Sequence, residues 1–159
     1  MKLFVLGLLV CASVQTVLLG PVSLGGIRPD LFLLLIFLLS PRVSPEAATI
    51  QGFLVGLCQD ALSGGPLGLR AFTYSLIGCA TAWLSHDLHT EKPLAQLWLL
   101  VAGAGGAGVV MLALLVFFLG VSPLLPALGV VVPEALYTAV FGFLLLRVPQ
   151  VRAALMRAI

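Results

Sequence analysis

The residues with the most chemical potential lie in one segment, residues 56–70, where an apolar run gives way to a turn. Asp60 closes that run, and Arg70 opens the next one. Between them lies a turn built from small residues and proline: Ser63, Gly64, Pro66 and Gly68. An ionisable group at membrane depth is costly and usually faces the protein interior or a water-filled cavity. This segment is therefore the first candidate for a functional site.

Further charged residues lie at the starts of two other apolar runs. Arg28, Pro29 and Asp30 precede the second run, and Glu134 opens the last one. Acidic side chains are favoured there, because the first turn of a helix carries the positive end of its dipole. If all these residues lie at one membrane face, we expect mutual ion pairs among Arg28, Asp30, Asp60, Arg70 and Glu134.

Catalysis by these groups is not expected. A nucleophile needs a base within hydrogen-bond reach, and an aspartyl protease needs two adjacent acids. Ser63 has no base nearby, because the two histidines, His86 and His89, fall in a loop at the opposite membrane face. Asp60 has only acids from other spans as partners. We therefore expect no enzyme, no catalytic residue and no cofactor.

Composition indicates an integral membrane protein. The chain is 61% hydrophobic and 9% charged, with a mean hydropathy of +1.21, whereas soluble domains carry about 25% charged residues. The net charge of +2 includes no basic run that would predict nucleic-acid binding. Three scattered cysteines fit neither a disulfide framework nor a metal site. No linker divides the chain, so we expect one domain over residues 1–159.

Hydropathy and turn residues predict an all-α bundle of six transmembrane helices. The expected spans are residues 3–20, 29–43, 45–62, 69–85, 94–119 and 133–146. The first resembles a signal peptide but lacks an Ala-x-Ala cleavage site, so we expect it to remain as a helix. The second has an apolar part of only about 13 Å. It requires bilayer thinning, snorkelling by Arg42 or burial among longer helices, and a re-entrant half-span is the alternative.

Small residues predict where helices pack closely. Ala48, Gly52, Gly56 and Asp60 recur every four residues and so share one face of span three. The Gly-x3-Gly pair lets a second backbone approach, and the small face of span four is the expected mate. Asp60 should therefore face protein rather than lipid. A glycine cluster at residues 103–108 of span five predicts either a close-approach surface or a kink.

The basic residues predict the orientation. With six spans, both termini face the same side of the membrane. Placing them in the cytoplasm puts six Lys and Arg residues inside (Lys2, Arg42, Lys92, Arg147, Arg152 and Arg157) and leaves two outside, Arg28 and Arg70. This distribution follows the positive-inside rule.

Taken together, these motifs resemble one known family. Arg28-Pro29-Asp30 before a short span, Gly52-x3-Gly56-x3-Asp60-x2-Ser63-Gly64-x-Pro66-Leu-Gly68 at the end of the third, and Glu134 opening the last are similar to the rod shape-determining protein MreD. The resemblance implies a multi-pass inner-membrane component of the bacterial elongation machinery. Its implied partners are MreC, a single-span protein, and through it MreB filaments, the RodA polymerase and a penicillin-binding transpeptidase. It also implies a fold similar to the six-helix substrate-binding subunits of vitamin transporters.

Two functions follow from these expectations. The first is a non-catalytic scaffold that binds an MreC-like protein and helps to control cell shape and lateral peptidoglycan synthesis. In it, Asp60 and Arg70 hold the hairpin of spans three and four rigid. The alternative is the vitamin-binding subunit of a transporter, whose cavity would need several convergent polar groups.

Overall fold

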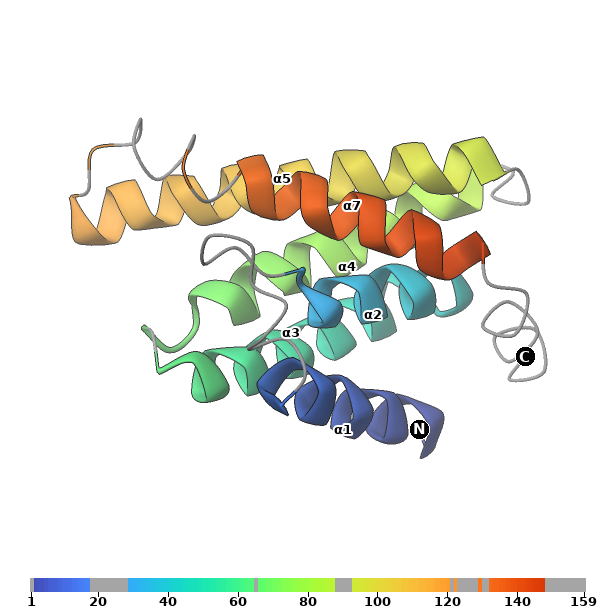
Figure 1. The fold of residues 1–159 in the computed structure, drawn as a ribbon, viewed down its shortest axis with the longest axis horizontal. Helices are drawn as coiled ribbons and strands as arrows, with labels where there is room; N and C mark the ends of the chain where they lie inside the picture. The colour runs from blue at the N-terminus through green and yellow to red at the C-terminus, as the bar shows by residue number, and fades with distance from the viewer. Residues whose placement is uncertain are drawn as a thin grey trace.

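The computed structural model describes residues 2–17, 29–64, 66–87, 93–120, 122, 129 and 132–147. Throughout these residues the fold is helical and contains no strand. Its helices are α1 (Lys2–Val17), α2 (Leu31–Leu39), η1 (a 3-10 turn, Ser40–Arg42), α3 (Pro45–Ser63), α4 (Leu69–Asp87), α5 (Pro93–Leu119) and α7 (Val132–Arg147). Successive α-helices run in opposite directions along the long axis of the molecule (Figure 1). The all-helical prediction is confirmed.

The helix boundaries follow from local capping chemistry. Ser44 caps α3 by accepting a hydrogen bond from the Ala47 backbone N–H at 3.4 Å, and Pro45 occupies the first turn. Gly64 ends α3 with a φ of 65°, in the left-handed region that favours glycine. The predicted span 29–43 is not one α-helix, because α2 ends at Leu39 and continues as η1.

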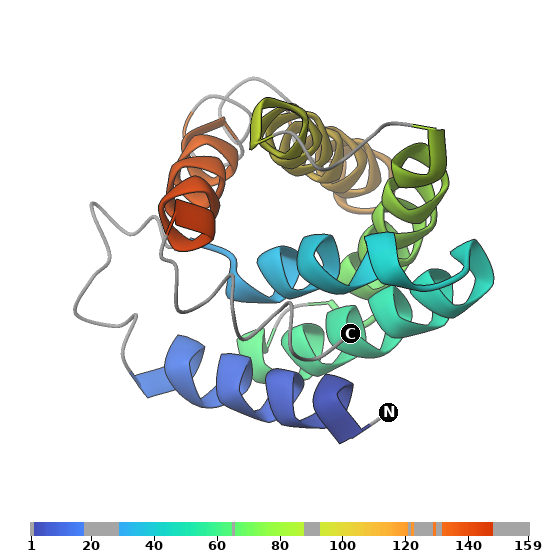
Figure 2. The ribbon, with the colours of Figure 1, turned by 90° about the vertical axis from the view of Figure 1, so that its right-hand side faces the viewer.

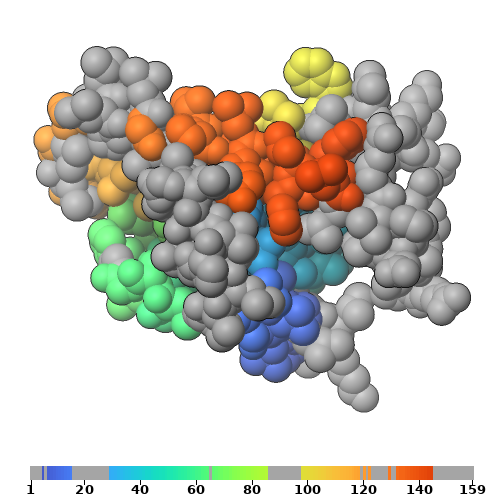
Figure 3. Space-filling view, in the orientation of Figure 1, coloured from blue at the N-terminus to red at the C-terminus, as the bar shows by residue number. Residues whose placement is uncertain are grey.

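Helix α2 is the centre of the molecule. Its residues from Leu31 to Phe37 are all buried, as expected for a helix that is apolar on every side. In Figure 2, α2 lies between α1 on one side and α5 and α7 on the other. On the face shown in Figure 3, the part of the chain around α2 appears only as a narrow strip between α7 and α1. Burial among longer helices therefore explains how so short an apolar helix is accommodated.

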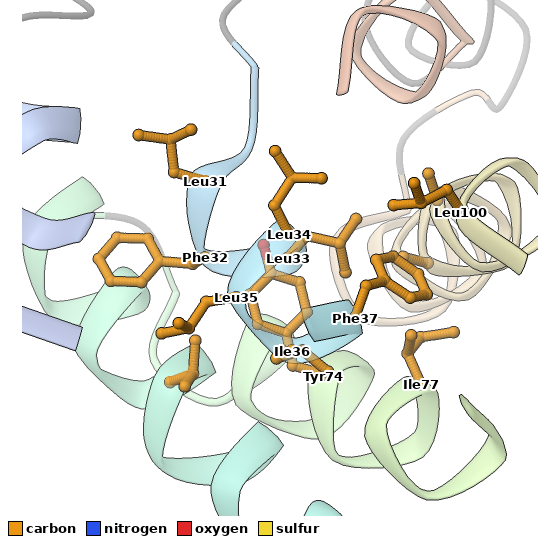
Figure 4. Packing of buried hydrophobic residues seen from close by; sticks show 13 residues of the cluster. Leu31, Phe32, Leu33, Leu34, Leu35, Ile36, Phe37, Tyr74, Ile77 and Leu100 are labelled. Atoms are coloured by element: carbon orange, nitrogen blue, oxygen red, sulfur yellow. The ribbon is translucent and has the colours of Figure 1, made fainter. Parts of the chain in front are cut away.

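Four successive side chains of α2 pack against glycines on four different helices. Leu34 fills the space above Gly142 of α7, and Leu35 lies 3.0 Å from where a Cβ of Gly7 in α1 would be. Ile36 packs at Gly78 of α4, and the ring of Phe37 covers Gly103 of α5. Figure 4 shows these side chains radiating from α2 in different directions. The glycines thus let the surrounding helices close onto one core helix.

Helices α3 and α4 form the most closely packed pair. A Cβ on Gly56 would lie 2.5 Å from the Arg70 carbonyl oxygen, and one on Gly52 would overlap the Tyr74 carbonyl. A Cβ on Gly78 would lie 2.6 Å from the Ala48 carbonyl oxygen. The two helices are antiparallel: moving forward along α3 from Ala48 to Gly52 to Gly56 moves the contact back along α4 from Gly78 to Tyr74 to Arg70. The small-residue face of α3 packs against α4, as expected.

Helix α5 is continuous from Pro93 to Leu119, so its glycine cluster makes no break. Gly103 is the close-approach position, while a Cβ on Gly105 would meet nothing within 4 Å. Among the described residues, one stretch, Trp98–Phe118, is long and apolar enough to cross a bilayer, and only 22% of it is buried inside the protein. Two shorter apolar helices cover Leu31–Arg42 and Val132–Leu144.

Candidate functional site

The three candidate acids each lie at the start of a helix. Asp30 is the N-cap of α2, Glu134 is in the first turn of α7, and Asp60 reaches the first turn of α4 from the end of α3. All three helices start on the side toward the left of Figure 1, where α4 begins farthest left and α2 begins near the middle of the molecule. Helix starts present unpaired N–H groups and positive partial charge. This end is therefore a natural place for buried carboxylates.

The Asp60 carboxylate closes the hairpin between α3 and α4. It accepts backbone hydrogen bonds from Gly68 N at 2.8 Å, from Arg70 N at 3.2 Å and from Ala71 N at 3.3 Å. The side chain is 3% exposed. Gly68 immediately precedes α4, and the N–H groups of Arg70 and Ala71 belong to its first turn, where they have no partner within that helix. Asp60 thus caps α4 from a different helix.

The connecting turn brings Asp60 to these donors. Gly64 and Gly68 have φ angles of 65° and 103°, which residues with a side chain rarely adopt. The Ser63 hydroxyl donates to the Asp60 carbonyl oxygen at 3.2 Å, so this hydroxyl forms its hydrogen bond within the turn. Pro66 is exposed at the tip. The predicted motif residues of this segment therefore form one local unit around Asp60.

Asp30 and Leu31, at the start of α2, join four helices. One carboxylate oxygen accepts from Phe32 N and Leu33 N, both at 3.1 Å, and the other accepts from the Tyr74 hydroxyl of α4. Its own backbone N–H donates to the Thr138 hydroxyl of α7 at 3.0 Å. The next residue, Leu31, donates its N–H to Gln15 of α1 at 3.2 Å. The start of α2 is thereby fixed to α1, α4 and α7.

Arg70 and Glu134 face a small cavity beside this junction. The cavity has a volume of about 60 Å³. Its lining combines polar residues of α2, α4 and α7 with small or apolar residues of α5: Asp30, Leu33, Arg70, Thr73, Tyr74, Ala104, Ala107, Gly108, Met111, Glu134, Ala135 and Thr138. Arg70 lies within electrostatic range of Asp30, Glu134 and Asp60.

The expected ion pairs are not formed among the described members of the set. Asp30, Arg70 and Glu134 line one cavity, but no salt bridge joins them or Asp60 within the described part of the chain. Both aspartates instead accept hydrogen bonds from backbone N–H groups, and Asp30 also accepts one from the Tyr74 hydroxyl. Asp60 contacts the backbone N–H of Arg70 rather than its guanidinium. Arg28 lies outside the described residues.

Three residues of the junction, Gln15, Tyr74 and Thr138, were not predicted from the sequence as site residues. Tyr74 and Thr138 each lie one helical turn after a predicted charged residue, Arg70 and Glu134 respectively. Residues four apart share a helix face. A search for polar side chains one turn beyond each charged residue would therefore have found both.

The polar contacts described above connect helix starts to neighbouring helices. Within the described helices, no group of three or more His, Cys, Asp or Glu residues is placed to hold a metal ion. Cys11, Cys58 and Cys79 are free thiols. The hydroxyls of Ser63 and Thr73 donate to backbone carbonyls of their own helices, at 3.2 and 2.8 Å. Neither of these two hydroxyls is paired with a base, and the hydroxyl that does meet a carboxylate is that of Tyr74, which donates to Asp30.

Comparison with known protein families finds a match over most of the chain. The family model described as rod shape-determining protein MreD matches residues 1–147 of the 159 in the chain. No curated protein and no solved structure matches the sequence.

Proposed function

The chain belongs to the family of the rod shape-determining protein MreD, and from this membership we propose that it is a multi-pass scaffold of the bacterial inner membrane. Membership assigns it a role in rod shape determination, as a membrane-associated structural component and not as a member of a known enzyme family. In the proposal, six spans place both termini in the cytoplasm. The scaffold binds an MreC-like single-span protein and, through it, acts on MreB, RodA, a penicillin-binding transpeptidase and lateral peptidoglycan synthesis.

The scaffold function is supported mainly by the hydrogen bonds of two buried aspartates, Asp30 and Asp60. Asp60 accepts from three backbone N–H groups, and Asp30 accepts from two backbone N–H groups and the Tyr74 hydroxyl. A general acid or base needs a free lone pair or proton directed at a substrate. These carboxylates are engaged in holding helices together, which supports a structural role.

The outer surface supports the membrane placement. Large apolar side chains are exposed on every described helix other than α2, including Leu9 of α1, Phe53 of α3, Trp83 of α4, Phe117 of α5 and Leu144 of α7. Soluble monomers rarely expose contiguous apolar patches of this kind. The alternating directions of the helices fit repeated crossings (Figure 1).

The transporter alternative receives no support from the cavity. Sites for drug-sized ligands occupy about 300–1,000 Å³, whereas the polar cavity holds about 60 Å³. A vitamin does not fit that volume. The scaffold is therefore the function that the geometry favours.

Affinity purification in mild detergent tests the proposal. The tagged full-length chain should retain an MreC-like single-span protein from a rod-shaped bacterium. Asp60→Ala should reduce that recovery at equal amounts of folded chain, because it loosens the α3–α4 hairpin. Glu46→Ala, which removes an exposed acid from the same helix, should not. Recovery of the chain alone, while other membrane complexes stay intact, would contradict the proposal.

A further inference from the structure

One end of the molecule gathers several helix termini that carry charged residues. Lys2 begins α1, Arg42 ends η1, Glu46 lies in the first turn of α3, Asp87 ends α4 and Arg147 ends α7. These termini lie toward the right of Figure 1, on the side away from the starts of α2, α4 and α7. Charged side chains are costly inside a bilayer. With the membrane placement proposed above, this end therefore lies close to water.

Two tryptophans lie just inside this end, on successive helices. Trp83 comes four residues before Asp87, the last residue of α4, and Trp98 comes five residues after Pro93, the first residue of α5. At 1.5 Å per residue, they lie about 6 and 7.5 Å from these termini. Their side chains are 66% and 68% exposed. Both indoles are thus directed at the surroundings of the bundle rather than at its core.

The packing of α4 on α5 places the two tryptophans at the same level. A Cβ on Gly106 of α5 would lie 3.5 Å from Cδ1 of Ile77 in α4. The two helices run in opposite directions (Figure 1). Trp83 comes six residues after Ile77, about 9 Å along α4, and Trp98 comes eight residues before Gly106, about 12 Å along α5. The two tryptophans therefore lie within about 3 Å of one level.

The surface changes from apolar to polar at this level. Beyond Trp83, residues 85–87 at the end of α4 are Ser-His-Asp. On the other side of the level, Leu76 of α4 and Val101 of α5 are exposed and apolar. The apolar stretch that is long enough to cross a bilayer begins at Trp98 itself. The two indoles therefore mark a boundary between polar and apolar surface.

An indole suits such a boundary because it combines a large apolar ring with a single N–H donor. In the hydrocarbon core that N–H would lack an acceptor, whereas lipid carbonyl and phosphate oxygens accept it at the membrane–water interface. Tryptophan is enriched there for this reason. The chemistry of the two side chains thus matches the interfacial layer of a bilayer.

We propose that Trp83 and Trp98 bind the interfacial layer of one leaflet and fix the depth of α4 and α5 in the bilayer. In the proposed orientation this leaflet is the cytoplasmic one. The inference rests on the proposed membrane placement but not on the proposed partner. It makes the two tryptophans the membrane-facing boundary of the end that carries Arg42 and Glu46.

Depth-dependent fluorescence quenching of the full-length chain in lipid vesicles tests the assignment. Trp83→Phe and Trp98→Phe each leave one native indole, because the chain has two tryptophans. Phosphatidylcholine with a nitroxide near the top of its acyl chain should quench each remaining indole at least about twofold more strongly than the same lipid labelled near the chain end. The two indole depths should agree within about 3 Å.

Phe72→Trp is the matched control, in a chain whose two native tryptophans are replaced by phenylalanine. Phe72 lies on α4 and is 51% exposed, but it comes eleven residues before Trp83, about 16 Å deeper along the helix. The new indole should be quenched most by the label near the chain end. Each variant is measured once its helical circular dichroism matches that of the native chain.

Three results would overturn the proposal. Stronger quenching of the native indoles by the deep label would contradict an interfacial position. Quenching by aqueous iodide, with none by either lipid label, would place them in water. Protection from all three quenchers would show that protein covers them. If the indole at position 72 also escaped both lipid labels, the membrane placement itself would be wrong, which separates a failure of this inference from a failure of the proposed function.

Discussion

At the scale of single residues, the acids at this end of the molecule satisfy helix starts. Asp60 accepts from the first turn of α4, and Asp30 accepts from the first turn of α2. The first four N–H groups of any helix lack partners within it, and water is scarce at membrane depth. A buried carboxylate with several N–H donors is thus stabilised without a direct cation.

Asp60→Ala should lower the free energy of unfolding by about 2–3 kcal/mol, because it leaves buried N–H groups of α4 unpaired. Asp60→Asn should cost less, since its amide oxygen can still accept from Gly68 and Ala71. Reversible unfolding in mixed detergent micelles measures both. Glu46→Ala, at an exposed acid of the same helix, should stay within ~0.5 kcal/mol of the native chain. Equal effects at the two acids would contradict the capping role.

Tyr74→Phe should destabilise the junction by about 1–3 kcal/mol, because one oxygen of the Asp30 carboxylate loses its donor in a buried site. Ser75→Ala is the neighbouring control. The Ser75 hydroxyl donates to the Thr49 carbonyl oxygen at 3.2 Å. Because Thr49 lies inside α3, that carbonyl also accepts a backbone hydrogen bond of the helix, so losing the Ser75 hydroxyl leaves it paired. The same unfolding measurement applies. A Ser75→Ala effect as large as that of Tyr74→Phe would argue against a special role for the Asp30 contact.

At the scale of elements, α2 and the glycines around it explain how the described helices pack closely around one core helix. Consecutive side chains from Leu34 to Phe37 each reach a different neighbouring helix at a glycine. Close approach matters here because lipid offers no hydrophobic drive for helix association, so packing contacts must supply it. The α3–α4 hairpin uses the same principle through Gly52 and Gly56.

Gly103→Ala should destabilise the bundle by about 1–3 kcal/mol, because its methyl group would overlap the buried ring of Phe37. Phe37→Leu should recover part of that loss when combined with it, giving a non-additive double-mutant cycle. Gly105→Ala provides the control, since a Cβ there meets nothing within 4 Å. It should be neutral or slightly stabilising. Strict additivity of the Gly103 and Phe37 changes would contradict the predicted contact.

At the scale of the whole molecule, α2, α4 and α7 all start toward one end, and η1 lies toward the other (Figure 1). The proposed orientation makes the first end external. The α3–α4 turn, with Leu67 73% exposed, then faces outward. In the same proposed orientation, the exposed start of α3 would face the cytoplasm. A reagent that cannot cross the membrane should therefore reach the first end from outside the cell and not the second.

Cysteine labelling in intact cells should separate these ends. In a chain whose three native cysteines are replaced by alanine, Leu67→Cys should react with a membrane-impermeant maleimide. Glu46→Cys, at an exposed position near the opposite end, should react only after permeabilisation. The reverse pattern would invert the orientation, and reaction of both in intact cells would contradict an even separation by the membrane.

The sequence by itself determined the helical class, most helix boundaries and the small-residue face of α3. These depend on local chemistry: apolar runs of sufficient length, Ser44 and Pro45 at a helix start, Gly64 at a helix end, and a four-residue period. Asp60 was predicted to face protein for the same reason. Such features need no knowledge of which helices meet.

Only the tertiary structure decided how the polar residues are used. The sequence predicted ion pairs among the acids and arginines, yet Asp60 binds backbone N–H groups and Asp30 binds Tyr74. From the sequence, the short α2 could cross a thinned bilayer, be buried among longer helices or form a re-entrant half-span. The structure shows it buried in the core. The physical reason is that a carboxylate pairs with whichever donors the packing brings to it. Tyr74 and Thr138 lie 44 and 108 residues away from Asp30.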